Sequence, residues 1–407
     1  ANFNEEYKDK GLQVEYVRYV NDDNGNLQLE TYLMGGGDVD LFIGYGGRTK
    51  MDKRVDSNLL LDMSGMLNDI GFNLDDELGV ANMAEYHYDD GAVYGFPTKY
   101  ENSRWILINE DMFKEAGLDI PYDGWTYSEF LADAEKLTHG EGQDKVYGVC
   151  WARKQSGKSI LYALDGVLGA NQIYKNEEGT EVNFDNDVYR AGLNLVKETL
   201  DKGYAIPIED EFSEDISVAN TFLQGKCAIM LGVAQMRLCM DQENYPHDFM
   251  TALVPAPVPD DEKYNTEFYR KQIGTTGAGD LLSISANTKY PEASFEFAMW
   301  YLKGGMSPLV QGGRIPLWNG VNKDEVLSVL KEKAQGSIDM DSMENYLSLD
   351  TTQGVAAIKG NASSEISSAW FEEFDAMCYG KQSVDQTVQN MEKRGNELIQ
   401  TELSSQK

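Results

Sequence analysis

The chain has few cysteines, few histidines and no long apolar run, and each shortage excludes a class of protein. No apolar run approaches the roughly 20 residues that a membrane-spanning helix needs. The four cysteines lack Cys-x-x-Cys spacing, so neither a zinc site nor a disulfide framework is predicted. The three histidines are isolated, without a second ligand at helical spacing. We therefore expect no metal and no cofactor.

Positive charge is also scarce. Lysine and arginine total 35 residues against 68 aspartates and glutamates, which gives a net charge of −33. Such a field repels nucleic acids and anionic lipids, because both require a positive surface. A solvated, self-repelling surface explains this charge better than an acidic recognition patch does. Nucleic acid is therefore excluded as a partner, and membrane attachment would need a separate lipid anchor.

Catalytic patterns are weak or absent. The sequence has no Gly-x-Ser-x-Gly elbow, and its carboxylates are too numerous for spacing alone to nominate a glycosidase pair. Residues 152–159 fit the loose phosphate-loop pattern, with Gly157-Lys158-Ser159 between a predicted strand and a predicted helix. The first glycine of that pattern is replaced by Ala152, and Arg153 and Lys154 crowd the loop. A chance match is therefore favoured over a nucleotide site.

The sequence does contain regular alternation of strands and helices. Its 407 residues, 42% of them hydrophobic, suit a globular protein of two or three domains. The alternation predicts an α/β architecture with largely parallel sheets. Strands are predicted at Leu12–Val20, Val39–Gly44, Trp105–Ile108, Val146–Trp151, Cys227–Leu231 and Leu281–Ser285. Helices are predicted at Ile160–Gly169, Asp187–Lys202 and Val218–Gln224, from Pro291 onward, and after a cap formed by Ser383 and Gln386. Pro255, Pro257 and Pro259 predict a rigid extended segment at a boundary between lobes.

Residues 93–138 carry the clearest local signals. Val93–Pro97 is predicted to be a short extended segment that a proline closes. The apolar run Trp105–Ile108 is typical of a buried strand. Asn109 then occupies the position of an N-cap, and Gly117 can adopt the left-handed conformation that ends the helix.

A second helix start follows, and the order of elements then matches that of a known family. Thr126 and Glu129 form a predicted capping box, and Trp125 is placed to pack against Phe130 as its hydrophobic staple. The ordered set resembles the bacterial extracellular solute-binding proteins of ABC transporters, family 1, the sugar- and oligosaccharide-binding group that includes maltose-binding proteins. The motifs that carry the resemblance are Tyr94-Gly95-Phe96-Pro97, Asn109, Ala116-Gly117-Leu118 and Trp125–Phe130.

The resemblance implies a type II periplasmic-binding-protein fold, with two lobes of mostly parallel sheets flanked by helices and a ligand cleft between them. Lobe one is expected to comprise residues 1–98 and 281–318, and lobe two residues 102–274 and 319–407. Hinge crossings are expected at residues 98–102, 274–280 and 314–322. Members of the family normally begin with a strand, a loop and a helix, whereas residues 1–10 resemble only the end of that helix. We therefore expect the first strand and its ligand contacts to be missing.

The resemblance also implies a binding protein rather than an enzyme. It would capture a carbohydrate, in our interpretation an oligosaccharide, by hinge closure outside the membrane and deliver it to an ABC permease. We expect a monomer, either a cell-surface lipoprotein of a Gram-positive bacterium or a periplasmic protein, whose targeting segment has been removed. The alternatives are a secreted carbohydrate-active enzyme, which needs two carboxylates about 5–10 Å apart across a cleft, and a nucleotide-binding protein that uses Lys158.

Ligand contacts are expected where strands end, because ligands of open α/β sheets bind outside the carboxyl ends of the strands. Aromatic rings can cover the C–H face of a sugar, and planar polar side chains can bond its hydroxyls in pairs. The residues with this chemistry near strand ends and lobe crossings are Tyr45, Arg48, Tyr100, Glu101, Asn102, Trp151, Arg153, Gln235, Arg237, Asp280, Arg314 and Trp318. The strongest candidates stand immediately at strand ends: Tyr45, Glu101, Trp151 and Asp280.

Two departures from maltose-binding relatives bear on the ligand. The loop after Gly232 has Val233-Ala234-Gln235 where relatives often offer a stacking tryptophan. Asp280 replaces the tryptophan of a Gly-Gly-Trp-Gly pattern before the late strand. The resemblance therefore implies a different stacking geometry, and it leaves a charged or amino-substituted sugar open as the ligand.

Overall fold

The computed structural model describes residues 2–18, 27–83, 86–102, 104–153, 173–176, 178–271, 280–349, 360 and 362–405. The chain divides into two compact units. Unit 1 comprises Ala1–Glu101 and Gly277–Val326, and unit 2 comprises Asn102–Thr276 and Leu327–Lys407. The chain therefore passes between the units after residues 101, 276 and 326. The lobe ranges and hinge crossings that the resemblance implies stay predictions.

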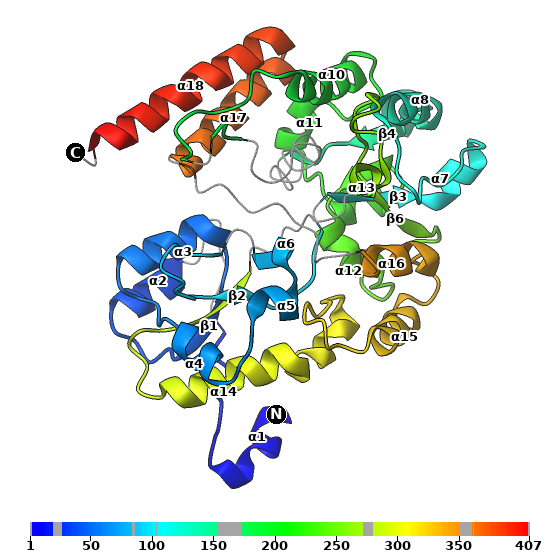
Figure 1. Ribbon diagram of the computed structural model, residues 1–407. Coiled ribbons are helices and arrows are strands. Elements are labelled where there is room, and N and C mark those ends of the chain that lie inside the picture. Colours follow the sequence, from blue (N-terminus) through cyan, green and yellow to red (C-terminus); the bar gives the residue numbers. More distant parts are fainter. Residues whose placement is uncertain are drawn as a thin grey trace. The chain divides into compact units, whose positions relative to one another are not determined.

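Unit 1 contains a three-stranded sheet in the order β1-β7-β2. The strands are β1 (Leu41–Gly44), β2 (Phe96–Pro97) and β7 (Leu281–Ile284). The helices are α1 (Asn2–Glu6), α2 (Leu27–Met34), α3 (Gly47–Asp56), α4 (Ser64–Asp69), α5 (Leu74–Leu78), α6 (Val80–Met83) and α14 (Pro291–Trp300). Figure 1 shows α2, α3 and α14 around this sheet. Phe42, Phe96 and Leu282 join the three strands to one apolar core.

Unit 2 contains a four-stranded sheet in the order β4-β5-β3-β6. The strands are β3 (Trp105–Asn109), β4 (Tyr147–Cys150), β5 (Cys227–Leu231) and β6 (Thr251–Pro255). The helices are α7 (Glu110–Glu115), α8 (Tyr127–Leu137), α10 (Asp187–Asp201), α11 (Ile208–Ser213), α12 (Met236–Cys239), α13 (Glu267–Arg270), α16 (Met340–Leu347), α17 (Ser363–Cys378) and α18 (Val384–Ser405), and α15 (Lys323–Ala334) spans the passage after residue 326. Every residue of β3, β5 and β6 is buried, which explains their continuous apolar runs.

The prediction of largely parallel sheets is wrong for the described pairings. In unit 2, β3 lies between β5 and β6 and is antiparallel to both, whereas β4 and β5 are parallel. In unit 1, β7 is antiparallel to both β1 and β2. The reason is that β3 and β7 each follow a passage between the units, and not a helical crossover within their own sheet, which is the connection that makes strands parallel. One reversed strand inside each sheet is enough to make most pairs antiparallel.

The predicted helix caps are confirmed. The side chain of Asn109 accepts a hydrogen bond of 3.1 Å from the backbone N–H of Met112. Gly117 has a φ of 69°, the left-handed conformation that ends the helix without strain in a residue lacking Cβ. The reciprocal capping box of Thr126 and Glu129 is also present. These signals were readable because each needs only residues within one helical turn.

Trp125, the predicted staple, also ties α8 to the sheet. Its ring lies edge-on to Phe130 with centroids 5.0 Å apart, and its indole N–H donates to the carbonyl of Pro255 at 2.9 Å. Its own carbonyl accepts a hydrogen bond of 3.0 Å from Val258. The lobe boundary predicted at the prolines of residues 255–259 is therefore wrong, because this segment continues β6 inside unit 2 and is held by hydrogen bonds.

Most other predicted elements are confirmed. The helix predicted at Asp187–Lys202 is α10, and the strand predicted at Cys227–Leu231 is β5. Ser383 and Gln386 exchange two hydrogen bonds at the start of α18, of 2.9 and 3.2 Å. The segment predicted as a helix at Val218–Gln224 is a single π-helical turn at Val218–Phe222. Short 3-10 or π turns also occupy Lys8–Lys10, Gly142–Asp144, Val233–Gln235, Tyr301–Gly305 and Ser307–Gly312. The helix predicted at Ile160–Gly169 lies outside the described residues.

The strand predicted at Leu12–Val20 is wrong over its described part, residues 12–18, which has no regular secondary structure. Tyr16 is 86% exposed. The side chain of Asn4 bonds both backbone groups of Val14, donating at 2.9 Å and accepting at 2.8 Å. No strand of the described chain pairs with this segment, and alternation of apolar residues without a pairing partner does not make a strand.

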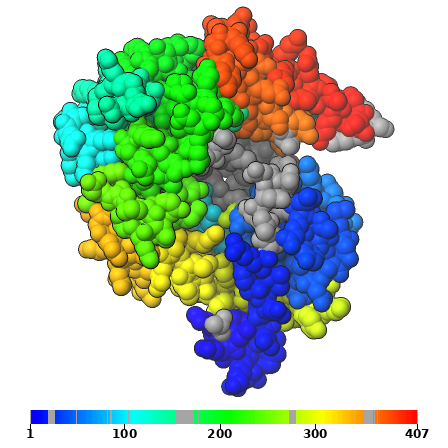
Figure 2. Space-filling model, turned by 180° about the vertical axis from the view of Figure 1, so that it is seen from behind, coloured from blue at the N-terminus to red at the C-terminus, as the bar shows by residue number. Residues whose placement is uncertain are grey.

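The N-terminal helix α1 packs against α14 within unit 1. The ring of Phe3 lies edge-on to Phe297 and Trp300, with centroids 5.1 and 5.3 Å apart. Glu6 accepts the indole N–H of Trp300 at 2.8 Å. Figure 2 shows this dark-blue segment beside the yellow part of unit 1. Edge-to-face ring contacts and one hydrogen bond to a carboxylate therefore hold a five-residue helix that would be unstable alone.

Three further observations concern the classes excluded by composition. None of the described helices is both long enough and apolar enough to cross a membrane. All four cysteines are free, and Cys150, Cys227 and Cys239 are buried, where thiols behave as small apolar groups. In the part of the chain that the structure describes, no three His, Cys, Asp or Glu side chains are grouped so as to hold a metal ion.

Candidate functional site

Two acidic and two basic side chains meet in unit 1, at the ends of β2 and β7. Lys99 Nζ lies 3.0 Å from Glu101 Oε2 and 2.8 Å from Asp280 Oδ2. Arg314 Nη1 lies 3.8 Å from the same oxygen of Asp280. We call these four residues the charge cluster. They come from three segments that are far apart in the sequence, and their formal charges cancel.

Backbone pairing fixes the position of the charge cluster. Residues 98–100 run antiparallel to residues 315–317, with a bridge between Lys99 and Pro316 and flanking hydrogen bonds of 2.7 and 2.9 Å. Asp280 directly precedes β7, whose first residue pairs with the last residue of β2. The Cα positions of the cluster therefore follow from the sheet and from the short ladder next to it, and only the side chains remain to be oriented.

Tyrosines border the charge cluster. Tyr45 directly follows β1, Tyr301 directly follows α14, and both are half-buried. Partial burial raises the pKa of Tyr301. Tyr45 and Asp280 raise that pKa further, whereas Arg314 lowers it, so these groups lie within electrostatic reach of one another. Tyr100 packs against the core of the unit.

Lys99 carries its charge despite its burial. Removal of water from the ammonium group lowers the pKa of Lys99, because burial disfavours the charged form. The attraction of Glu101 and Asp280 outweighs this effect, and the pKa lies above its ordinary value. Lys99 is therefore positively charged at neutral pH.

This arrangement is suited to an uncharged, hydroxyl-rich ligand. A carboxylate has two acceptor oxygens, so an oxygen that bonds Lys99 leaves its partner oxygen available to a hydroxyl group. Guanidinium and phenol groups add donors, and the tyrosine rings offer faces for C–H groups. Three of the residues predicted from the sequence meet in the charge cluster: Glu101, Asp280 and Arg314. Tyr45 lies within electrostatic reach of Tyr301, and its role as a ligand contact stays a prediction.

Two other predicted residues of unit 1 have structural partners elsewhere. Arg48 bonds Asp52 at 2.7 Å and lies over the ring of Tyr88, with its guanidinium carbon 3.9 Å from the ring centroid. Trp318 donates its indole N–H to Glu77 at 2.6 Å. These contacts explain both residues through packing, and a role in ligand binding stays a prediction for them.

In unit 2, Trp151 fills the core. It is 2% exposed, its indole N–H donates to Thr199 at 2.9 Å, and its ring packs against Phe130 with centroids 5.7 Å apart. The chain leaving β4 therefore directs this side chain between α8 and α10, and not toward a ligand. We do not retain Trp151 among the proposed contacts.

The remaining predicted residues of unit 2 are dispersed. Arg153 forms a bidentate pair with Asp375 at 2.7 and 2.9 Å. Arg237 is exposed and donates to Gln235 at 3.1 Å. Asn102 is buried. Their roles as ligand contacts stay predictions, and the Gly157-Lys158-Ser159 segment lies outside the described residues.

Sequence reasoning missed two members of the site, Lys99 and Tyr301. Lys99 stands between residues already chosen at the predicted crossing, so its position could have flagged it. Lysine was not considered for sugar binding, because its side chain is neither aromatic nor planar and polar. Tyr301 falls in the helix predicted from Pro291 onward, where nothing in the sequence separates its hydroxyl from those of other helix tyrosines.

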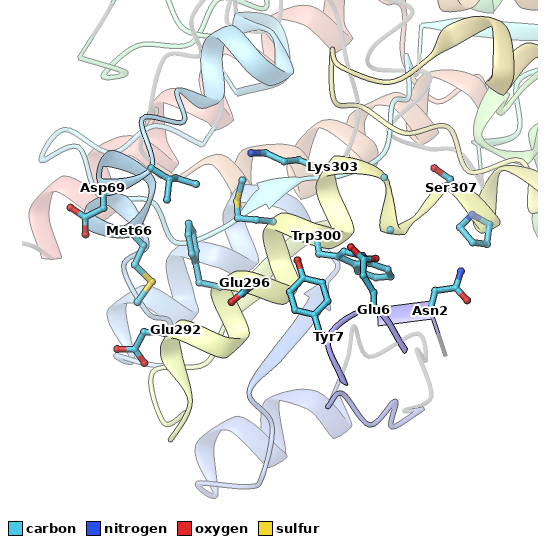
Figure 3. A pocket seen from close by; sticks show the side chains of 16 residues that line it. Asn2, Glu6, Tyr7, Met66, Asp69, Glu292, Glu296, Trp300, Lys303 and Ser307 are labelled. Carbon is cyan, nitrogen blue, oxygen red and sulfur yellow. The ribbon is translucent and has the colours of Figure 1, made fainter. Parts of the chain in front are cut away.

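A separate cavity of about 970 Å³ opens in unit 1 among α1, α4 and α14. Figure 3 shows Tyr7 and Glu6 on one side of it, near Trp300 and Lys303 of the α14 region. Met66 of α4 lines it as well. None of the residues predicted to bind ligand lines this cavity. It is a product of the way α1 docks on α14, and it is distinct from the charge cluster.

Comparison with known proteins gives a family and a fold. The family model for bacterial extracellular solute-binding proteins matches residues 1–303. A sugar transporter from Rhizobium etli, solved in an open conformation, is 18% identical with a TM-score of 0.74 over 97% of this chain and 94% of that chain. The sugar-binding protein MalE from Xanthomonas citri is 16% identical with a TM-score of 0.70 over 98% and 93%. An ABC substrate-binding protein from Listeria monocytogenes, in complex with cycloalternan, is 16% identical with a TM-score of 0.69 over 97% and 94%.

These structural likenesses confirm the predicted fold, because proteins this distant in sequence share their architecture over almost the whole of both chains. The family match covers most of the 407 residues. The chain belongs to the bacterial extracellular solute-binding protein family.

Proposed function

We propose that this protein is the substrate-binding component of an ABC importer and that it captures an uncharged carbohydrate, an oligosaccharide in our interpretation. The observation that carries the proposal is the charge cluster of Lys99, Glu101, Asp280 and Arg314, bordered by tyrosines. Sugars need paired hydrogen-bond donors and acceptors together with aromatic faces. The cluster supplies donors and acceptors without a net charge to be neutralised.

The structural neighbours support the same ligand class. Two of them are described as a sugar transporter and a sugar-binding protein, and a third was solved with cycloalternan. We extend to this chain the general class and none of the individual ligands. We further propose that it acts as a monomer outside the membrane, as a lipoprotein of a Gram-positive bacterium or as a periplasmic protein, and passes its ligand to the permease.

The proposed mechanism is hinge closure. A ligand shifts a conformational equilibrium only by the difference between its affinities for the two states. Contacts that form only in the closed state would therefore supply the driving force. The three passages of the chain between its units, after residues 101, 276 and 326, would accommodate the change in backbone angles.

A thermal-shift screen tests the proposal. Neutral oligosaccharides, neutral monosaccharides and nucleotides are added separately, and the melting temperature is recorded against ligand concentration. A ligand that binds only the folded protein stabilises it by about 2.7 kcal/mol at 100 times its Kd, so the expected result is a rise that continues with the concentration of one saccharide. The Asp280→Asn variant should lose most of this rise.

The matched control is Lys202→Met, which removes an exposed lysine that pairs with Glu198 in unit 2 at 2.7 Å. It should retain the full ligand-induced rise. Stabilisation by nucleotides and by no saccharide would contradict a carbohydrate-binding function. Release of smaller sugars during incubation would instead indicate an enzyme, and the proposal of a pure binding protein would then be rejected.

A further inference from the structure

We infer that Lys99 is a positioning residue that holds Glu101 and Asp280 in place and balances their charge, so that the site selects an uncharged saccharide over its amino-substituted counterpart. This inference rests on the proposed function and deepens it, because it assigns a charge class to the ligand and a residue that determines it.

The geometry gives Lys99 a role with two partners. Its ammonium group contacts one oxygen of Glu101 at 3.0 Å and one of Asp280 at 2.8 Å. An ammonium group has three donors, so it can bond both carboxylates at once. The side chains are sheltered, with 20% of Lys99, 16% of Glu101 and 12% of Asp280 exposed. Solvent therefore screens these pairs less than it would at an open surface.

Lys99 is also held by its own backbone. Its bridge to Pro316 places it in the ladder of residues 98–100 and 315–317. The two carboxylates belong to different segments of the chain, since Glu101 lies two residues beyond Lys99 and Asp280 directly precedes β7. A single fixed cation thus orients two acceptors that the chain brings from separate segments. Repulsion between those two carboxylates would otherwise push their side chains apart.

The balance of charge determines what the site can accept. With Lys99 and Arg314 opposite Glu101 and Asp280, an uncharged ligand adds no charge to a sheltered region. A ligand ammonium would add a positive charge that has to compete with Lys99 for the same oxygens. Burying an unpaired charge is costly, whereas a hydroxyl can accept from the lysine and donate to a carboxylate.

Removal of the lysine should therefore reverse the preference. The Lys99→Met variant keeps most of the length of the side chain but leaves two carboxylates opposed only by Arg314. A ligand ammonium can then occupy the place of the lysine ammonium, as a charge-assisted partner of both acids. The Lys99→Arg variant restores the charge and serves as the conservative rescue.

The first test measures binding by calorimetry with two probes of the same length and linkage. Cellotriose is the neutral probe, and the β-1,4-linked glucosamine trisaccharide is the cationic probe. The wild-type protein and Lys99→Arg should prefer cellotriose. Lys99→Met should bind cellotriose about tenfold more weakly, as expected when hydrogen bonds to charged groups are lost, and should prefer the glucosamine probe. A general loss of structure would weaken the binding of both probes alike. If Lys99→Met still prefers cellotriose as the wild-type protein does, the inference is overturned.

The second test needs no ligand, and it separates failure of the inference from failure of the proposed function. Melting temperatures are compared in a double-mutant cycle of Lys99→Met with Glu101→Gln, with Lys202→Met replacing Lys99→Met in the control cycle. Glu101→Gln should lower the melting temperature of the wild-type protein and raise that of Lys99→Met, because it then removes an uncompensated charge. An identical effect of Glu101→Gln in both backgrounds overturns the inference.

The two tests together distinguish failure of the proposed function from failure of the role inferred for Lys99. If neither trisaccharide binds the wild-type protein, the proposed function fails for these probes, and the double-mutant cycle alone decides whether Lys99 holds the carboxylates. If cellotriose binds and the cycle shows no coupling, the proposed function stands and the role of Lys99 is rejected.

Discussion

Replacement of Gly148 by alanine should destabilise unit 2 more than any change of similar size at an open position. A Cβ atom at Gly148 in β4 would lie 2.9 Å from the Cα and carbonyl carbon of Ala134 in α8, and closer still to its oxygen. Because carbon atoms pack best about 3.5–4.0 Å apart, β4 and α8 would have to separate by about 1 Å. The clash is with backbone, which no rotamer change can relieve. We expect a cost of about 3 kcal/mol, at the upper end of values for overpacked cores.

Denaturant and thermal unfolding followed by tryptophan fluorescence measure this cost. The buried tryptophans of unit 2 provide the signal: Trp105, Trp125, Trp151 and Trp370. For a unit of this size the melting temperature should fall by about 6–12 °C. Gly65→Ala is the control, since no atom lies within 4 Å of a Cβ there, and it should leave the melting temperature unchanged or raise it slightly. If Gly148→Ala melts within about 1 °C of the wild-type protein, then β4 and α8 can separate at little cost and the reasoning is refuted.

Three further predictions concern unit 2. Partial burial raises the pKa of Asp133 to about 6. The folded protein therefore favours the protonated carboxyl, whose contribution to the free energy of unfolding is complete below the unfolded pKa near 3.8 and is lost as the pH rises through 6. The shift would correspond to about 3 kcal/mol, which solvent screening of this half-exposed carboxylate reduces to about 1 kcal/mol; Asp133→Asn should therefore raise the melting temperature at pH 7.5, and thermal melts at decreasing pH should show the gain disappearing toward pH 4. Trp125→Phe removes the indole N–H that bonds Pro255 at 2.9 Å and should lower the free energy of unfolding in urea by about 2 kcal/mol; an unchanged midpoint would show that this carbonyl finds another donor. Tyr346→Phe removes the hydroxyl that accepts the backbone N–H of Asn102 at 2.8 Å and should cost about 1–2 kcal/mol in the same assay, and faster hydrogen exchange at that amide should accompany the loss.

Local elements were predictable because their signals are local. The N-cap at Asn109 and the capping box at Thr126 each depend on residues three positions away. The strand at Cys227–Leu231 is buried along its whole length, which leaves an apolar run that needs no knowledge of its neighbours. The resemblance to a known family added what local signals could not give, namely that the separate elements form one fold.

Strand direction was not predictable from alternation alone. It depends on whether the chain between two strands stays in one unit, and β3 and β7 follow passages from the other unit. The strand prediction for residues 12–18 is wrong for a related reason. Their alternating pattern is real, but a strand exists only when another strand supplies its hydrogen bonds, and the described chain supplies none here.

The candidate site separates two kinds of sequence evidence. Position near a strand end did bring Glu101 and Asp280 into one cluster, because the end of β2 lies opposite the start of the antiparallel strand β7. The same rule failed for Trp151, which also stands at a strand end but turns into the core. Position at a strand end therefore selects candidate ligand contacts, and the direction of each side chain decides among them. That direction depends on the helices packed over the end of the sheet.

Lys99 shows why composition is a poor guide to the charge of a binding site. The chain as a whole carries a net charge of −33, which would favour a cationic ligand if the site resembled the average surface. The charge cluster instead pairs each acid with a base. Screening weakens the contribution of distant surface charges over about 10 Å at moderate salt, so the nearest groups dominate. The selectivity of the site should therefore follow the cluster, and neutralising exposed acids far from it should leave the preference between neutral and amino-substituted sugars unchanged.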